Sequence, residues 1–188
     1  MSEDRLEARR LATSVYVGTS VDGFIARPAG EVDFLDSAEP LDEDYGFADF
    51  LASVDALVMG RNTFDWVIES GVEWPYGDKL VLVMTSRAFV APPGLADLVE
   101  PTGLGPAEVL IDLAARGVER VYVDGGQTIQ SFLRAGLVDE LTITKVPVLI
   151  GTGIALFGEL TGDVRLEHLE TTSFDNGLVQ SRYRVPRS

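Results

Sequence analysis

The feature that most constrains the fold of this chain is a series of short, uninterrupted apolar runs, each followed by small or polar residues. The runs cover residues 56–59, 80–84 and 121–123, the last at the centre of a strand predicted over 120–124, and segments with helical periodicity lie around them. A continuous apolar run of this length is typical of a strand buried on both faces, as in a parallel sheet covered by helices. We therefore predict an α/β fold with a mostly parallel central sheet and helices on both faces.

The remaining elements follow from residue type and spacing. A strand is predicted over 13–17, ending at Gly18, and another over 138–148. Helices are predicted over 42–53, from 61 to about 70, over 105–116 and over 127–135. A loop is predicted over 27–44, which is rich in Pro, Gly and acidic residues. The segments 164–173 and 178–185 flank an Asp-Asn-Gly turn and predict a C-terminal antiparallel hairpin.

The chain has 188 residues, a length that favours one domain. Residues 1–11 are predicted to be a charged N-terminal arm, and residues 12–188 to be one domain without internal repeats. No stretch reaches the roughly 20 apolar residues of a membrane span, and the first ten residues lack the apolar core of a secretory signal. These patterns predict a cytoplasmic protein without a membrane partner.

Composition excludes several classes of function. Lys and Arg number 15 and Asp and Glu 30, so the formal net charge is −15. Such a charge repels a phosphodiester backbone, and no nucleic-acid partner is expected. With no cysteine and one histidine, disulfides, thiol nucleophiles and a Cys/His zinc site are ruled out, and no metal site is predicted.

Small, hydroxyl-bearing and basic residues follow the ends of the three apolar runs. The segments concerned are Gly60-Arg61-Asn62-Thr63, Thr85-Ser86-Arg87 and Gly125-Gly126-Gln127-Thr128. Ligands bind at the carboxyl ends of parallel strands, where glycine permits close backbone approach and a helix start presents free N–H groups. Arginine matches phosphate oxygens in a bidentate manner. Together these residues predict a local anion site suited to a dinucleotide phosphate cofactor.

Each of these segments also has an ordinary structural interpretation. Glycine after a strand often only marks a turn, and an exposed arginine is usually a solvated charge. The Rossmann fingerprint GxGxxG is absent. The functional interpretation therefore depends on the three segments meeting in space.

Beyond these patterns, the chain resembles a known family. The stretches Val17-Gly18-Thr19-Ser20-Val21-Asp22-Gly23 and Leu57-Val58-Met59-Gly60-Arg61 look like the dihydrofolate reductase fold. Tyr122-Val123-Asp124-Gly125-Gly126 and Pro147-Val148-Leu149-Ile150-Gly151 look like the reductase (RibD C-terminal) domain of bacterial riboflavin biosynthesis and its stand-alone relatives. The resemblance spans about residues 12–185.

The resemblance implies NADPH as the hydride donor. By position, Gly60, Arg61 and Thr63 would hold cofactor phosphates, and Thr85, Ser86 and Arg87 would surround the adenosine 2′-phosphate. Gly125, Gly126, Gln127 and Thr128 would form the pyrophosphate loop, and Ser20 and Asp22 the loop that closes over the nicotinamide. Asp44, at the start of the first predicted helix, matches the substrate carboxylate of folate reductases; the alternative is that it only complements the helix dipole.

Two departures narrow the expected activity. Folate reductases carry a Pro-Trp pair after the first strand, where this chain has Arg27-Pro28-Ala29-Gly30. The zinc ligands of the riboflavin deaminase cannot exist without cysteine. The expectation is an NADPH-dependent reductase of a small heterocycle, resembling 5-amino-6-(5-phosphoribosylamino)uracil reductase.

Two other interpretations stay open. The first alternative is a noncatalytic nucleotide-binding module on the same fold. The second is a dihydrofolate reductase-like enzyme with another pteridine-type substrate. The resemblance also implies a homodimer, and the apolar run 146–150 near Leu156-Phe157 would suit its interface.

Overall fold

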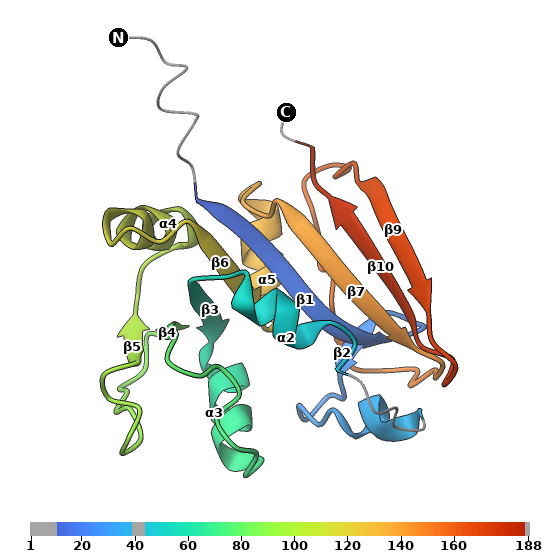
Figure 1. The fold of residues 1–188 in the computed structure, drawn as a ribbon, viewed down its shortest axis with the longest axis horizontal. Coiled ribbons are helices and arrows are strands. Elements are labelled where there is room, and N and C mark those ends of the chain that lie inside the picture. Colours follow the sequence, from blue (N-terminus) through green and yellow to red (C-terminus); the bar gives the residue numbers. More distant parts are fainter. Residues whose placement is uncertain (1–10, 39–43, 187–188) are drawn as a thin grey trace, which may run out of the picture.

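The computed structural model describes residues 11–38 and 44–186. The predicted arm therefore lies outside the described residues except for Leu11, which is buried in the core. The described chain forms an eight-stranded sheet in the order β5-β4-β3-β6-β1-β7-β10-β9, with helices on both faces (Figure 1). Among the described residues, none of the helices has the length and apolar character needed to cross a membrane.

The strands of the large sheet are β1 (Ala12–Ser20), β3 (Ala56–Gly60), β4 (Leu80–Met84), β5 (Val99–Thr102), β6 (Arg120–Asp124), β7 (Glu140–Val146), β9 (Glu167–Ser173) and β10 (Val179–Arg184). Strands β5 to β7 in the sheet order pair in parallel, whereas β10 pairs antiparallel with β7 and β9. Two short strands, β2 (Phe24–Ala26) and β8 (Ile154–Ala155), form a separate pair. The predicted mostly parallel sheet with a C-terminal hairpin is confirmed.

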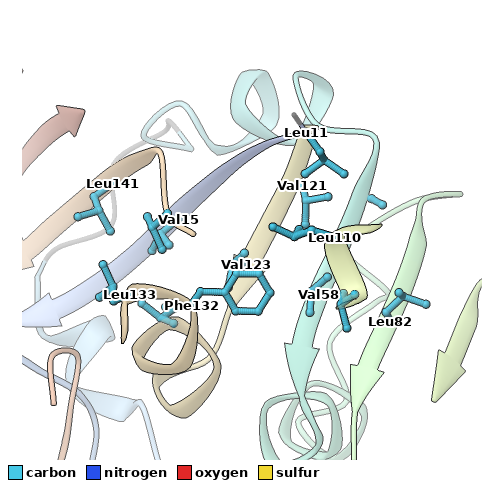
Figure 2. Close-up of a cluster of buried hydrophobic side chains, with 14 of the residues drawn as sticks. Leu11, Val15, Val58, Leu82, Leu110, Val121, Val123, Phe132, Leu133 and Leu141 are labelled. Carbon is cyan, nitrogen blue, oxygen red and sulfur yellow. The ribbon is translucent and has the colours of Figure 1, made fainter. Parts of the chain in front are cut away.

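The helical segments are η1 (Asp33–Ser37), α2 (Phe47–Ala52), α3 (Arg61–Glu69), α4 (Pro106–Ala115) and α5 (Gly126–Arg134). Alternate residues of the central strands point to opposite faces and build two cores. One core packs α4 and α5 against Val58, Val123 and Leu141, and the Phe132 side chain of α5 is fully buried in it (Figure 2). The other packs α2 and α3 against Leu57 and Met59.

Four predictions differ from the structure in their details. Strand β1 does not end at Gly18 but runs to Ser20, because its pairing with β7 continues to Val146. Strand β5 was not predicted; it is an edge strand that contains Pro101, and proline weakens the sequence signal of a strand. The predicted loop over 27–44 contains the short helix η1.

The fourth difference concerns the helix predicted over 42–53, which begins only at Phe47. Tyr45 and Gly46 both adopt left-handed backbone conformations, with φ of 57° and 87°, so a right-handed helix cannot extend through them. Tyr45 is held there because its carbonyl oxygen accepts hydrogen bonds from the Tyr16 hydroxyl and from Gln180 Nε2. Residues 42 and 43 of the predicted helix lie outside the described residues.

The packing of α5 against the central strands is expected to contribute strongly to the stability of the fold. Phe132→Ala removes a fully buried ring and should lower the free energy of unfolding by about 3–5 kcal/mol. Ile111→Ala, on the exposed side of α4, is the matched control and should change it by less than about 0.5 kcal/mol, because Ile111 is 70% exposed. Chemical denaturation measures both; a loss below about 1 kcal/mol for Phe132→Ala would contradict the packing described.

Candidate functional site

A cavity of about 650 Å³ lies at the carboxyl ends of four adjacent strands, β4, β3, β6 and β1. The parallel pairing brings these strand ends to one edge of the sheet, although the chain passes through them in a different order. Neighbouring strands are about 4.8 Å apart, so the edge from β4 to β1 spans about 14 Å. The cavity is thus elongated along the sheet edge, with the end of β4 on one side and the end of β1 on the other.

Glycines allow the loops around the cavity to pack closely. A side-chain Cβ on Gly60 would lie 2.9 Å from the Thr128 hydroxyl, and one on Gly126 would lie 2.6 Å from Ile25 Cδ1. Gly125 has a left-handed φ of 88°, and a Cβ there would overlap the Thr63 hydroxyl. Gly125 therefore requires glycine, and the close approaches at Gly60 and Gly126 bring three loops into contact.

Two helices begin at the cavity wall. Helix α3 starts immediately after Gly60, and α5 starts immediately after Gly125. The first N–H groups of a helix have no acceptor within it, and neither of these helices has a side-chain cap. Because the helix dipoles add partial positive charge at the same ends, this wall attracts an anion despite the net charge of −15.

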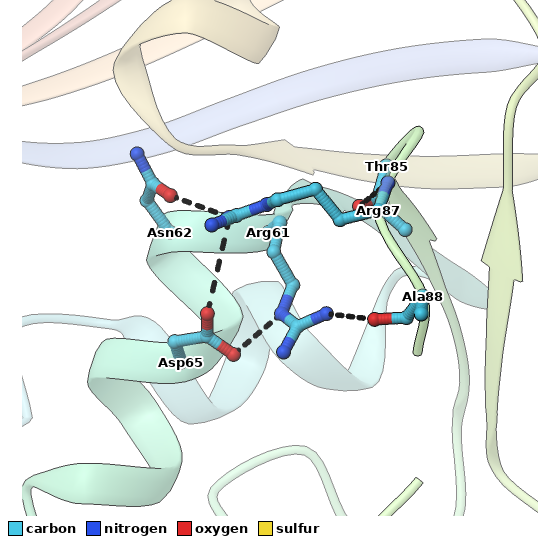
Figure 3. A network of polar contacts seen from close by, with 6 residues as sticks. All are labelled: Arg61, Asn62, Asp65, Thr85, Arg87 and Ala88. Atoms are coloured by element: carbon cyan, nitrogen blue, oxygen red, sulfur yellow. Dashed lines mark hydrogen bonds and ion pairs between the residues drawn. The ribbon is translucent and has the colours of Figure 1, made fainter. Parts of the chain in front are cut away.

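The two arginines that line the cavity, Arg61 at the start of α3 and Arg87 after β4, have different surroundings (Figure 3). Arg61 Nε is 2.6 Å from Asp65 Oδ1, its Nη1 donates to the carbonyl oxygen of Ala88, and its guanidinium lies over the Phe89 ring. Arg61 therefore ties α3 to the segment after β4.

Arg87 is less constrained than Arg61. Its side chain is 61% exposed, against 26% for Arg61. One of its nitrogens donates to Asn62 Oδ1, and the same nitrogen is 4.0 Å from Asp65 Oδ2. The remaining donors of Arg87 are available to a ligand phosphate.

The structure brings most of the predicted site residues together. Those that line the single cavity are Gly60, Arg61, Thr63, Thr85, Ser86, Arg87, Gly125, Gly126, Gln127 and Thr128. Segments that are far apart in the sequence thus meet at one sheet edge. Their role in binding a cofactor stays a prediction.

Ser20 and Asp22 do not line this cavity. Ser20 is buried and its hydroxyl accepts a hydrogen bond from the Phe24 N–H. The Asp22 carboxylate accepts hydrogen bonds from the N–H groups of Ile150 and Gly151, and hydrogen bonds, foremost that with Ser20, lower its pKa. The pair ties the turn after β1 to the loop before β8; its predicted role at the nicotinamide stays a prediction.

Asp44 also lies outside the lining of the cavity. Its carboxylate accepts hydrogen bonds from the N–H groups of Ala48 and Gly46, which lower its pKa. The contact with the Ala48 N–H places the carboxylate beside the N-terminus of α2, where its charge complements the helix dipole. The structure gives Asp44 a structural role, and its catalytic role remains untested.

Asp124 is a cavity residue that was not assigned a role from the sequence. It ends β6, lines the cavity, accepts a hydrogen bond from the Gly125 N–H at 2.8 Å and lies 3.5 Å from the Tyr76 hydroxyl. Burial raises the pKa of its carboxyl. The available signal was an acidic residue at the end of an apolar run, directly before two glycines.

Three tyrosines and several apolar side chains line the cavity together with Asp124. They are Tyr16, Tyr76, Tyr122, Ile25 and Leu35. The cavity therefore offers aromatic and apolar walls besides its carboxyl group. A flat ring with a polar edge is the shape such walls accommodate.

Comparisons with known proteins agree with this architecture. The model of the RibD C-terminal domain family matches residues 14–180. The uncharacterized protein YwjB of Bacillus subtilis (strain 168) is 32% identical over 173 residues, which are 91% of this chain and 96% of that protein.

Two solved structures extend the comparison. The "Putative riboflavin biosynthesis protein" from Shewanella sp. PV-4 is 38% identical, with a TM-score of 0.88 over 94% of this chain and all of that chain. A diaminohydroxyphosphoribosylaminopyrimidine deaminase/5-amino-6-(5-phosphoribosylamino)uracil reductase from Thermotoga maritima is 15% identical, with a TM-score of 0.72. That match covers 96% of this chain and 58% of the Thermotoga chain, and it shows the shared fold.

The raised pKa of Asp124 predicts a pH-dependent effect on stability. A carboxyl whose pKa is higher in the folded state than in the unfolded state destabilises the fold at pH values above the folded pKa, where it must ionise. Asp124→Asn should therefore increase the free energy of unfolding by about 1 kcal/mol at pH 8. The gain should vanish as the pH falls below about 4, where the carboxyl is protonated in both states.

Denaturant titrations at pH 8 and pH 4 measure this difference. Asp163→Asn, in an exposed loop, is the matched control and should show no gain at either pH. A lower free energy of unfolding for Asp124→Asn at pH 8 would contradict the raised pKa of the Asp124 carboxyl.

Proposed function

The chain belongs to the RibD C-terminal domain family, and from that premise we propose that it is an NADPH-dependent reductase of a small heterocyclic substrate. The observation that carries the proposal is the meeting of two uncapped helix N-termini and Arg87 around one cavity that also holds Asp124. The first three features suit a phosphorylated dinucleotide, and the fourth suits a substrate that must be protonated.

The residues present fit NADPH. The N–H groups at the starts of α3 and α5 would hold the pyrophosphate, since the glycines before both helices let a ligand approach the backbone. Arg87, Ser86 and Thr85 would hold the 2′-phosphate at the β4 end. The nicotinamide would then lie toward β6 and β1, because the strand order continues in that direction. When bound, the reduced nicotinamide supplies a hydride.

Asp124 would provide the proton for the reduced product. Hydride addition to a C=N carbon leaves a nitrogen that needs a proton, and a carboxyl with a raised pKa retains one closer to neutral pH. The Gly125 N–H binds one of its oxygens and the Tyr76 hydroxyl lies 3.5 Å from the other, and these contacts hold the carboxyl at the cavity. Tyr16, Tyr76 and Tyr122 would exclude water around the reacting atoms.

A noncatalytic nucleotide-binding module is the second candidate. It would share the phosphate-binding wall, but it would not need a carboxyl group with a raised pKa in the cavity. The presence of Asp124 there favours an enzyme. Titration of NADPH followed by assays of NADPH oxidation with aminouracil and dihydrofolate-type compounds separates the two: binding without turnover of any of them supports the module.

Arg87→Ala is expected to weaken NADPH binding by about tenfold or more and to change NADH binding by less than about threefold, because only NADPH carries the 2′-phosphate. Arg61→Ala should weaken both cofactors, since Arg61 holds the segment after β4 to α3. Arg134→Ala, at the exposed end of α5, is the control and should leave both unchanged. Fluorescence titration measures the dissociation constants; equal losses for both cofactors in Arg87→Ala would reject the 2′-phosphate assignment.

Asp124→Asn is expected to lower kcat by about 100-fold or more while the dissociation constant for NADPH stays within about threefold, because the amide cannot supply the proton. The assay uses a compound that the unmodified protein reduces. Asp163→Asn serves again as the control, with kcat unchanged. Retention of more than a third of kcat in Asp124→Asn would show that the proton comes from another source.

A further inference from the structure

A second cavity of about 650 Å³ lies beside α2, on the face of the sheet formed by β1, β7, β10 and β9. Helix α2 covers only part of this face, and the cavity is a groove between the helix and the strands, which we call the α2 groove (Figure 1). Among the described residues, Tyr16 is the one that lines both this groove and the proposed cofactor cavity. The α2 groove is therefore a separate site, and its ligand does not depend on the reductase function.

Two hydroxyl groups on the floor of the groove have no hydrogen-bond partner among the described residues. Ser14 and Thr142 are only 4% and 8% exposed, and both line the groove. They lie on the neighbouring strands β1 and β7, on the same face of the sheet. A polar ligand in the groove would provide the hydrogen bonds that these nearly buried hydroxyls lack.

Three charged side chains that line the groove are also unpaired within the described part of the chain. Glu140 on β7 is the register partner of Ser14, and Asp49 lies on α2. Arg120 begins β6, which flanks β1 on the side opposite to β7. Together they present two negative charges and one positive charge to the groove.

Several other polar groups of the groove are already engaged. Gln180 Nε2 donates to the Tyr16 hydroxyl and to the Thr144 hydroxyl. Arg182 Nη1 lies 3.8 Å from Glu170 Oε2, and the two side chains form an ion pair. The charges left open to a ligand are therefore the three unpaired ones.

We propose that the α2 groove binds a free amino acid with a cationic side chain, of which lysine is the simplest example. Such a molecule carries two cationic groups and one carboxylate at neutral pH, which matches the unpaired charges of the groove. The cationic groups would bind Asp49 and Glu140, and Arg120 would bind the carboxylate through two parallel hydrogen bonds. The hydroxyls of Ser14 and Thr142 would accept further hydrogen bonds from an ammonium group.

The positions of the charged groups suit a ligand with a long side chain. Arg120 and Glu140 lie on the two strands that flank β1, so two strand spacings, about 10 Å, separate their backbones. A ligand that binds both side chains must hold its carboxylate and its terminal cation several bonds apart, as lysine does and glycine does not. The net charge of −15 also favours a ligand whose own net charge is positive.

Calorimetric titration with lysine and three related compounds tests the proposal. Lysine should bind the unmodified protein with a Kd below about 1 mM at low ionic strength. Cadaverine lacks the carboxylate, norleucine lacks the side-chain ammonium and glycine lacks the side chain, so each should bind at least about fivefold more weakly than lysine. Absence of lysine binding at about 10 mM, or equal binding of lysine and cadaverine, would overturn the proposal.

Variants of the charged residues assign the binding to this groove. Glu140→Gln and Asp49→Asn, on opposite walls, should each weaken lysine binding by about fivefold or more, and Arg120→Gln should abolish the preference for lysine over cadaverine. Arg134→Gln, on α5 at the opposite face of the sheet, is the control and should change neither quantity. Lysine binding that is unchanged in both Glu140→Gln and Asp49→Asn would overturn the proposal.

Saturation with NADP⁺ distinguishes this site from the cofactor cavity. Lysine should bind the NADP⁺-saturated protein within about threefold of its affinity for the free protein, because the two cavities share only the Tyr16 wall among the described residues. Displacement of lysine by NADP⁺ would place lysine in the cofactor cavity and overturn the proposal. A protein that binds lysine in the α2 groove but does not bind NADP⁺ would reject the reductase function alone.

Discussion

The parallel pairing of β4, β3, β6 and β1 is the constraint on which the rest of the structure depends. It brings the carboxyl ends of four strands, which are separated by long stretches of sequence, to one edge of the sheet. Two of those ends continue directly into helices, so two sets of free backbone N–H groups face one cavity. The positive potential of the site therefore comes largely from backbone groups. Because of these groups, the site can attract an anion with few basic side chains, although the net charge of the chain is −15.

The order of strands also arranges the chemistry along the cavity. Arg87 follows β4, Arg61 begins α3 directly after β3, and Asp124 ends β6 directly before the N-terminus of α5. The cavity residues thus come from successive strands along one edge of the sheet. This arrangement would allow one elongated cofactor to be bound by its phosphates while a reacting ring lies beside a carboxyl group.

The surroundings of Asp124 combine features that disfavour ionisation and favour function. Burial raises the pKa of its carboxyl, and hydrogen bonds from the Gly125 N–H, Tyr122 and Tyr76 offset this effect only in part. Asp44 and Asp22 show the opposite case, because backbone and side-chain hydrogen bonds lower their pKa values on exposed loops. Among these three acids, only the one in the cavity is poised to hold a proton.

The sequence by itself determined the central strands, the helices α3, α4 and α5, and the three loops that form the phosphate-binding wall. These depend on local signals: continuous apolar runs, helical periodicity and glycine at strand ends. The edge strand β5 depends on its pairing with β4. The start of α2 depends on the contacts that hold Tyr45 in a left-handed conformation. Neither kind of contact leaves a clear pattern in the local sequence.

Only the tertiary structure decided which acid lies in the cavity. The sequence singled out Asp44, which binds the N–H of nearby Ala48, whereas Asp124 was not assigned a role and its contact with Tyr76 joins residues distant in the chain. Local patterns record how a segment folds, whereas the environment of a carboxyl group is determined by the segments that pack around it.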